Sequence, residues 1–99
     1  MAQVTLPTYG ETVFTSVASS ASSVTLLAAN HQRKRVFISN ASTAILYVRL
    51  DTTGATANAT SGHSIQMAAN TNVEIVGFTG VITGIWASAN VFANMTELK

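Results

Sequence analysis

The chain has 99 residues, of which 47% are apolar, 9% are charged and none is cysteine, and its formal net charge is +1. This length suits one domain with a single core. The charged fraction is far below the roughly 25% that soluble domains usually carry. The absence of cysteine excludes a disulfide framework and a thiolate metal site. The near-zero net charge gives no electrostatic reason to expect nucleic acid as a partner.

The distribution of apolar residues disfavours two further classes of protein. No window approaches the roughly 18 consecutive apolar residues of a membrane-spanning helix, so we expect no membrane partner. The first residues, Met1 to Pro7, lack a basic region followed by a long apolar run, and we therefore expect no signal peptide. Small secreted domains often depend on disulfides, so the lack of cysteine favours an intracellular origin or support from oligomerisation.

The missing charge is replaced by Ala, Thr, Ser and Asn rather than by large hydrophobic residues. Isolated soluble proteins usually keep themselves apart with a denser and mixed surface charge. The composition therefore favours a protein that works packed against another surface. The alternative is a neutral surface of small polar residues that the protein merely tolerates.

Period-2 alternation of apolar and polar residues recurs along the chain and is typical of β-strands. Turn residues such as Ser, Asn and Gly separate the alternating runs. The run from Ile45 to Leu50 is apolar on both faces, so we expect a central strand that is covered on both sides. In chain order the pattern predicts strands at Tyr9–Ala18, Val24–Ala28, Arg35–Ser39, Ile45–Leu50, Ser64–Ala68, Asn72–Val76, Val81–Ala87 and Val91–Leu98.

These strands make the predicted fold class all-β, because no convincing helical period accompanies them. An antiparallel β-sandwich or jelly-roll-like barrel of about seven or eight short strands is the natural architecture. We predict a single β-sandwich domain over residues 1–99, in which residues 1–22 form an N-terminal arm together with the first strand. Asp51 to Gly62 carries no large apolar residue, which predicts a functional or mobile loop, or alternatively a polar edge ribbon.

Few residues offer chemistry for catalysis or metal binding. The two histidines, His31 and His63, fall at loop edges and are most simply solvated, and Asp51 could approach His63 only through the fold. The four carboxylates are scattered, so neither a glycosidase pair nor a metal site is indicated. The dispersed glycines form no phosphate-binding loop. The sequence therefore predicts no enzyme activity, no cofactor, no metal and no small-molecule substrate.

Arg33-Lys34-Arg35 is the one cluster of charge, and it holds three of the five basic residues at the start of a predicted strand. Such a cluster could contact an acidic partner surface or a phosphate. Alternatively, it is a solvated turn that keeps the end of a strand soluble. We treat Arg33, Lys34 and Arg35 as a candidate partner-contact patch.

Three aromatic residues, Trp86, Tyr47 and Phe37, could in principle form a stacking platform for a sugar. Trp86, however, lies within an apolar strand between Gly84 and Ala87, as expected for an aromatic residue of a core or of a subunit interface. We therefore predict that Tyr47 and Trp86 are core or subunit-interface aromatics.

The pattern of strands and turns also resembles a known family over roughly residues 23 to 98. The sharpest part is Gly80-x-Ile82-x-Gly84-Ile85-Trp86-Ala87-Ser88-Ala89, and Asn90-Val91-Phe92 stands where the family often has a small or glycine-containing turn. The family consists of small tailed-bacteriophage proteins of the virion-structural type. The residues that carry the resemblance are Val24 to Asn30, Arg33, Val36 to Asn40, Ser42, Leu46 to Val48, Gly80 to Ala89 and Thr96 to Leu98.

The resemblance implies a β-sandwich virion structural protein, namely a capsid decoration (cement) protein on the outer face of a bacteriophage shell. Its partners would be the major capsid protein and copies of itself in a homotrimer, joined by protein–protein interaction. It would reside in the virion after assembly in the cytoplasm of the host bacterium. A tail, baseplate or fibre-associated structural module is the main alternative, and a carbohydrate-binding module is a further one. The resemblance implies no catalytic residue.

Overall fold

A computed structural model contains all eight strands that the alternation predicts. It describes residues 11–52, 56–57 and 62–99, so residues 1–10 of the predicted arm and parts of the predicted 51–62 loop lie outside it. The strand ends agree with the prediction to within one residue, apart from the start of the first strand, whose predicted position, Tyr9, lies outside the described residues. The strands are β1 (Thr12–Ala18), β2 (Val24–Leu27), β3 (Arg35–Asn40), β4 (Leu46–Asp51), β5 (Ile65–Met67), β6 (Asn72–Val76), β7 (Val81–Trp86) and β8 (Phe92–Leu98).

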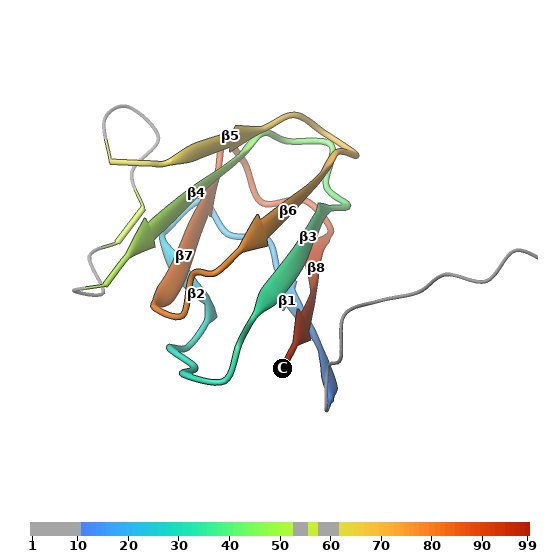
Figure 1. Ribbon diagram of the computed structural model, residues 1–99. Helices are drawn as coiled ribbons and strands as arrows, with labels where there is room; N and C mark the ends of the chain where they lie inside the picture. Colours follow the sequence, from blue (N-terminus) through green and yellow to red (C-terminus); the bar gives the residue numbers. More distant parts are fainter. Residues whose placement is uncertain (1–10, 53–55, 58–61) are drawn as a thin grey trace, which may run out of the picture.

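The strands form two four-stranded antiparallel sheets that pack face to face as a sandwich (Figure 1). Sheet A has the strand order β1-β8-β3-β6, and sheet B has the order β2-β7-β4-β5. The first strand pairs with the last, the second with the seventh, the third with the sixth and the fourth with the fifth. This is the jelly-roll arrangement of a rolled-up hairpin. The predicted all-β class and sandwich architecture are therefore confirmed.

Most connections cross from one sheet to the other, so they gather at the two ends of the sandwich. The β2–β3 and β6–β7 connections and the carboxyl end of β8 lie together at what we call the lower end, after its place in Figure 1. The β1–β2, β3–β4, β5–β6 and β7–β8 connections lie at the upper end. In the part of the chain that the structure describes, no helix is long and apolar enough to cross a membrane.

Inward-facing side chains of both sheets form one hydrophobic core. In the middle of β7, Gly84 gives room to leucines of the flanking strands, because a Cβ there would lie 2.9 Å from Leu26 Cδ1 and 3.0 Å from Leu46 Cδ1. The largest buried members of the core are Leu26, Leu27, Val36, Ile38, Leu46, Val48, Met67, Ile75, Ile82, Trp86 and Met95.

The strand predicted to be central and covered on both sides is central but covered on one side only. β4 lies between β7 and β5 in sheet B, and it buries Leu46 and Val48 in the core. On its other face, Tyr47 and Arg49 are only half-buried. The reason is that a two-layer sandwich covers a single face of each sheet.

Candidate interaction surface

Arg33, the first residue of the predicted patch, lies inside the lower end of the sandwich and is 2% exposed. Its Nε donates to Glu97 Oε2 at 2.6 Å, and its Nη2 donates to the carbonyl of Ala28 at 2.6 Å. Its Nη1 donates to the carbonyls of Phe78 and Gly80 at 3.1 and 3.0 Å. One guanidinium thus joins the β2–β3 connection, the β6–β7 connection and β8. We call this set of contacts the arginine clamp.

The three residues of the predicted patch do not share one surface. Arg33 is buried in the arginine clamp, whereas Lys34 is exposed just before the start of β3. Arg35 faces outward from sheet A, and its Nη1 lies 2.9 Å from Glu74 Oε2. A contact role for Lys34 and Arg35 stays a prediction, and the buried position of Arg33 leaves it little surface for a partner.

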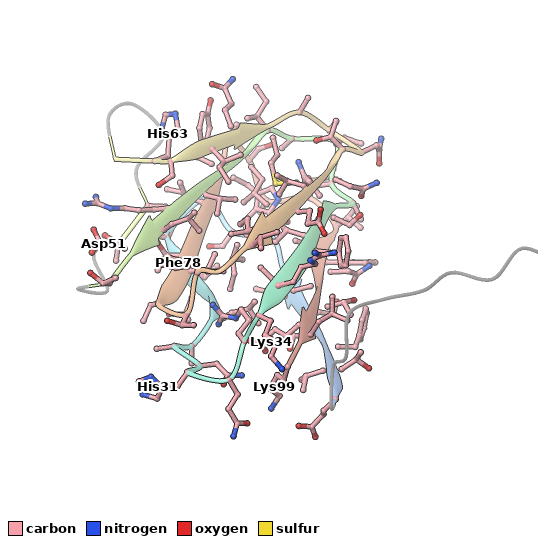
Figure 2. All side chains as sticks on the ribbon, viewed as in Figure 1. His31, Lys34, Asp51, His63, Phe78 and Lys99 are labelled. Atoms are coloured by element: carbon pink, nitrogen blue, oxygen red, sulfur yellow. The ribbon has the colours of Figure 1, made fainter. Side chains whose placement is uncertain are left out.

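Next to the arginine clamp, the lower end contains a cavity of about 600 Å³. Figure 2 labels three of the residues around it, His31, Lys34 and Lys99. Lys99 Nζ lies 3.3 Å from Glu11 Oε1, so part of the positive charge is balanced within the chain. The positive charge of the cavity therefore gives no strong reason to expect an anionic ligand. The residues that line the cavity are Glu11, His31, Gln32, Arg33, Lys34 and Lys99.

A second cavity, of about 250 Å³, is lined by Asp51, His63 and Ser64 among others. Figure 2 labels Asp51 and His63. Asp51 Oδ2 accepts a hydrogen bond from Arg49 Nε at 3.1 Å, and the His63 ring lies 4.9 Å from the Tyr47 ring between centroids. Ser64 Oγ accepts a hydrogen bond from a backbone N–H of β4 at 3.1 Å. The contacts of His63 and Ser64 hold the start of β5 against β4. Among the described residues, no group of three or more His, Cys, Asp or Glu could hold a metal ion.

The upper end of the sandwich is organised by Asn40, which is fully buried. Its Nδ2 donates to the carbonyls of Ala44, Met67 and Ala68 at 2.9, 3.2 and 3.2 Å. Its Oδ1 accepts hydrogen bonds from Ser42 N and Trp86 Nε1, both at 3.2 Å. In the sequence, Asn40 directly follows the predicted strand Arg35–Ser39, where its side chain indicates only a turn. We call these contacts the asparagine clamp.

The aromatic residues considered as a sugar platform point to three different places. Trp86 faces the core and is 1% exposed. Tyr47 is half-buried on the outer face of sheet B beside His63, and Phe37 lies on the outer face of sheet A. They form no common stacking surface.

The side of sheet A that faces away from the core is the most distinctive surface of the described residues. We define the outer face of sheet A as the outward-facing side chains of β1, β8, β3 and β6. All five exposed large apolar side chains lie on it or at its upper rim: Phe14, Phe37, Val76, Val91 and Phe92. The outer face of sheet B has no exposed large apolar side chain among its described residues.

The strand register arranges the outer face of sheet A in rows that carry few charges. Phe14 pairs with Thr96, Thr96 pairs with Phe37, and Phe37 pairs with Glu74. The neighbouring row holds Ser16, Asn94, Ser39 and Asn72. The strands of this face present one cation and one anion, Arg35 and Glu74, and these two pair with each other. The surface therefore offers apolar contacts and hydrogen-bonding groups with almost no net charge.

The edge strand β1 adjoins this face and lacks the usual protection against pairing. Edge strands normally carry charge, proline, a bulge or a very short length. β1 has seven residues, Thr12 to Ala18, with no charge and no proline. The opposite edge, β6, carries Glu74, while sheet B ends in the short strands β2 and β5. Within the described residues, β1 pairs only with β8.

Comparison with known proteins finds a likeness in fold alone. No protein-family model matches the chain, and no curated protein matches it. A solved structure described as Bacillus endospore appendages that form a novel family of disulfide-linked pili matches 99% of this chain and 98% of its own chain. The TM-score is 0.52 and the sequence identity is 11%. The matched protein is a pilus component, which is a structural protein rather than an enzyme.

This comparison corrects the expectation of a bacteriophage protein. The full-length match is to a spore appendage, so the phage resemblance, the capsid decoration role and the major capsid protein as a partner are wrong. The expected homotrimer on a phage shell and the expected location in a virion are wrong for the same reason. The physical reason is that Gly84 and Trp86, which carried much of the resemblance, serve packing inside the sandwich. Such packing residues report a fold rather than a biological origin.

Proposed function

We propose that this chain is a non-catalytic structural subunit that self-assembles into a fibre. The observation that carries the proposal is the outer face of sheet A. The exposed large apolar side chains lie on this face or at its rim, and its two charged side chains, Arg35 and Glu74, form an ion pair with each other. A surface of this kind marks a protein–protein contact. The likeness in fold to a pilus component supports a fibre as the product of that contact.

The exposed phenylalanines set the scale of the contact. Phe14 is 66% exposed and Phe37 is 41% exposed. Burying what remains accessible of both rings would contribute roughly 5 kcal/mol. Two molecules lose at least about 4 kcal/mol of translational and rotational freedom when they associate. A single such contact is therefore weak, and many copies that repeat it are needed for a stable assembly.

The geometry of sheet A suits open-ended growth. Its four strands alternate in direction, so its two edges, β1 and β6, run in opposite directions. Copies that all face the same way can therefore place β6 of one beside β1 of the next in antiparallel orientation, and their outer faces of sheet A then form one continuous apolar surface that a second row of copies can cover. A head-to-tail contact that does not close on itself produces a filament.

The assembly that we propose differs in one chemical respect from the matched pili. Those pili are described as disulfide-linked, whereas this chain contains no cysteine. Copies of these 99 residues therefore cannot be joined by disulfides. We expect fibres that persist in a reducing agent and that dissociate in denaturant without one.

The test is assembly of the purified chain, followed by sedimentation and electron microscopy with and without reductant. We expect regular fibres above a critical concentration. In Phe14→Ser/Phe37→Ser, that concentration is expected to rise at least about tenfold, which corresponds to roughly 1.4 kcal/mol of lost contact. The thermal midpoint of the subunit should change little, because both rings are largely outside the core.

The matched control is Thr25→Ser/Gln66→Ser, which alters two exposed residues on the outer face of sheet B. We expect this variant to assemble like the unaltered chain. A chain that stays monomeric at every concentration would refute the proposed function. Equal losses in the two double variants would refute the assignment of the contact to sheet A.

A further inference from the structure

The β7–β8 connection holds a valine in a backbone conformation that valine disfavours. Val91 has a φ of 62°, in the left-handed region, where a β-branched side chain is a genuine outlier. The other non-glycine residue with positive φ among the described residues is Asn70, and asparagine tolerates this region well. The strain at Val91 is therefore exceptional within the described chain.

Hydrogen bonds from two neighbouring connections fix this conformation. Ser19 N donates to the carbonyl of Val91 at 3.1 Å, and Ala41 N donates to the carbonyl of Phe92 at 3.1 Å. Asn90 N donates to Ser19 Oγ. The tip of the connection is thus tied to the β1–β2 and β3–β4 connections rather than left loose at the upper end.

The side chain of Val91 does not offset the strain within its own subunit. It is 52% exposed, and it is absent from the core cluster and from the residues packed against that cluster. A glycine or an asparagine would occupy the same backbone conformation with less strain. What valine adds is an apolar isopropyl group at the surface, where it is available for contact with another molecule.

We propose that the β7–β8 tip, formed by Val91 and Phe92, docks on the outer face of sheet A of a second copy of this chain. The proposal rests on the proposed function, because it names part of the contact between copies. The tip is continuous with the outer face of sheet A, since Phe92 is 37% exposed and pairs with Ala18 of β1. Residues 87–92 carry no charge, so they match an almost uncharged face.

The limited size of the face leaves room for a contribution from the tip. Four strands about 4.8 Å apart, with the longest seven residues at about 3.3 Å each, cover roughly 440 Å² in projection. A standard stable interface buries about 800 Å² on each partner. The tip at the rim of the sheet therefore extends the apolar surface beyond the area of the four strands.

The experiment compares Val91→Asn and Val91→Gly with the unaltered chain. Both variants remove the apolar group and relieve the strain, and asparagine does so without the flexibility of glycine. Below the critical concentration, we expect the thermal midpoint of the subunit to stay equal or rise by a few degrees. In the same variants, we expect the critical concentration for fibre formation to rise at least about fivefold. Ala89→Gly, which alters an exposed residue of the same connection, should leave that concentration unchanged.

The outcomes separate this proposal from the proposed function. Docking by the tip is supported if the Val91 variants assemble more weakly while their subunits stay as stable as the unaltered chain. If the Val91 variants assemble unchanged while Phe14→Ser/Phe37→Ser assembles more weakly, docking by the tip is refuted and the proposed function is not. A fall in the thermal midpoint of the Val91 variants would show that Val91 stabilises its own subunit, and it would also refute docking by the tip. An unaltered chain that never assembles overturns both proposals.

Discussion

Replacing Arg33 with methionine is expected to lower the free energy of unfolding by about 3–5 kcal/mol. The variant would leave the Glu97 carboxylate, whose side chain is 9% exposed, without its cation. It would also remove the donor from three backbone carbonyls of the arginine clamp. Removing one member of a buried ion pair is far more costly than the pair's net contribution, because the remaining charge stays desolvated. Urea denaturation followed by circular dichroism measures the loss.

The neighbouring Arg35 provides a matched control, because it is the same residue type in a partly exposed pair with Glu74. Arg35→Met should cost less than about 1 kcal/mol, as exposed ion pairs usually do. The double variant Arg33→Met/Glu97→Leu should recover part of the loss, since it removes the stranded charge as well. Similar losses for Arg33→Met and Arg35→Met would show that the arginine clamp does not hold the lower end together.

The alternation of apolar and polar residues was sufficient to predict the strands and the sandwich. It also contained a signal for the arginine clamp that the sequence analysis missed. Glu97 follows Ala93 and Met95 on the inward-facing positions of β8, so its carboxylate lies on the core side. A carboxylate on that side requires a buried cation. Arg33 was instead grouped with Lys34 and Arg35 as a surface patch, because adjacent basic residues are usually solvated.

Other features depend on contacts between distant residues, and local sequence does not determine them. The pairing of β1 with β8 joins the two ends of the described chain, and no turn between them specifies it. The alternation places Phe14 and Phe37 on one side of their strands, but only the assembled sheet puts them in one row. The positive φ of Val91 likewise arises from hydrogen bonds with two other connections. The surface proposed for assembly is therefore a product of the fold.

Replacing Asn40 with alanine is expected to lower the free energy of unfolding by about 3–5 kcal/mol, because it breaks the asparagine clamp. Two buried donors, Ser42 N and Trp86 Nε1, would lose their acceptor, and three carbonyls would lose a donor. Each buried polar group left without a partner costs about 1–3 kcal/mol, and partial access of water limits the sum. Trp86 is the single tryptophan of the chain, so its fluorescence emission provides a local measure of the same change.

The control for Asn40 is Asn72→Ala, which removes the same side chain from an exposed position on β6. Asn72→Ala should change the free energy of unfolding by less than about 0.5 kcal/mol and should leave the emission of Trp86 unaltered. If Asn40→Ala retains both the stability and the emission spectrum of the unaltered chain, the asparagine clamp is not what closes the upper end. In that event the packing of Trp86 against the core would suffice to fix the connections there. The strained β7–β8 tip would then depend on its own three hydrogen bonds for its position.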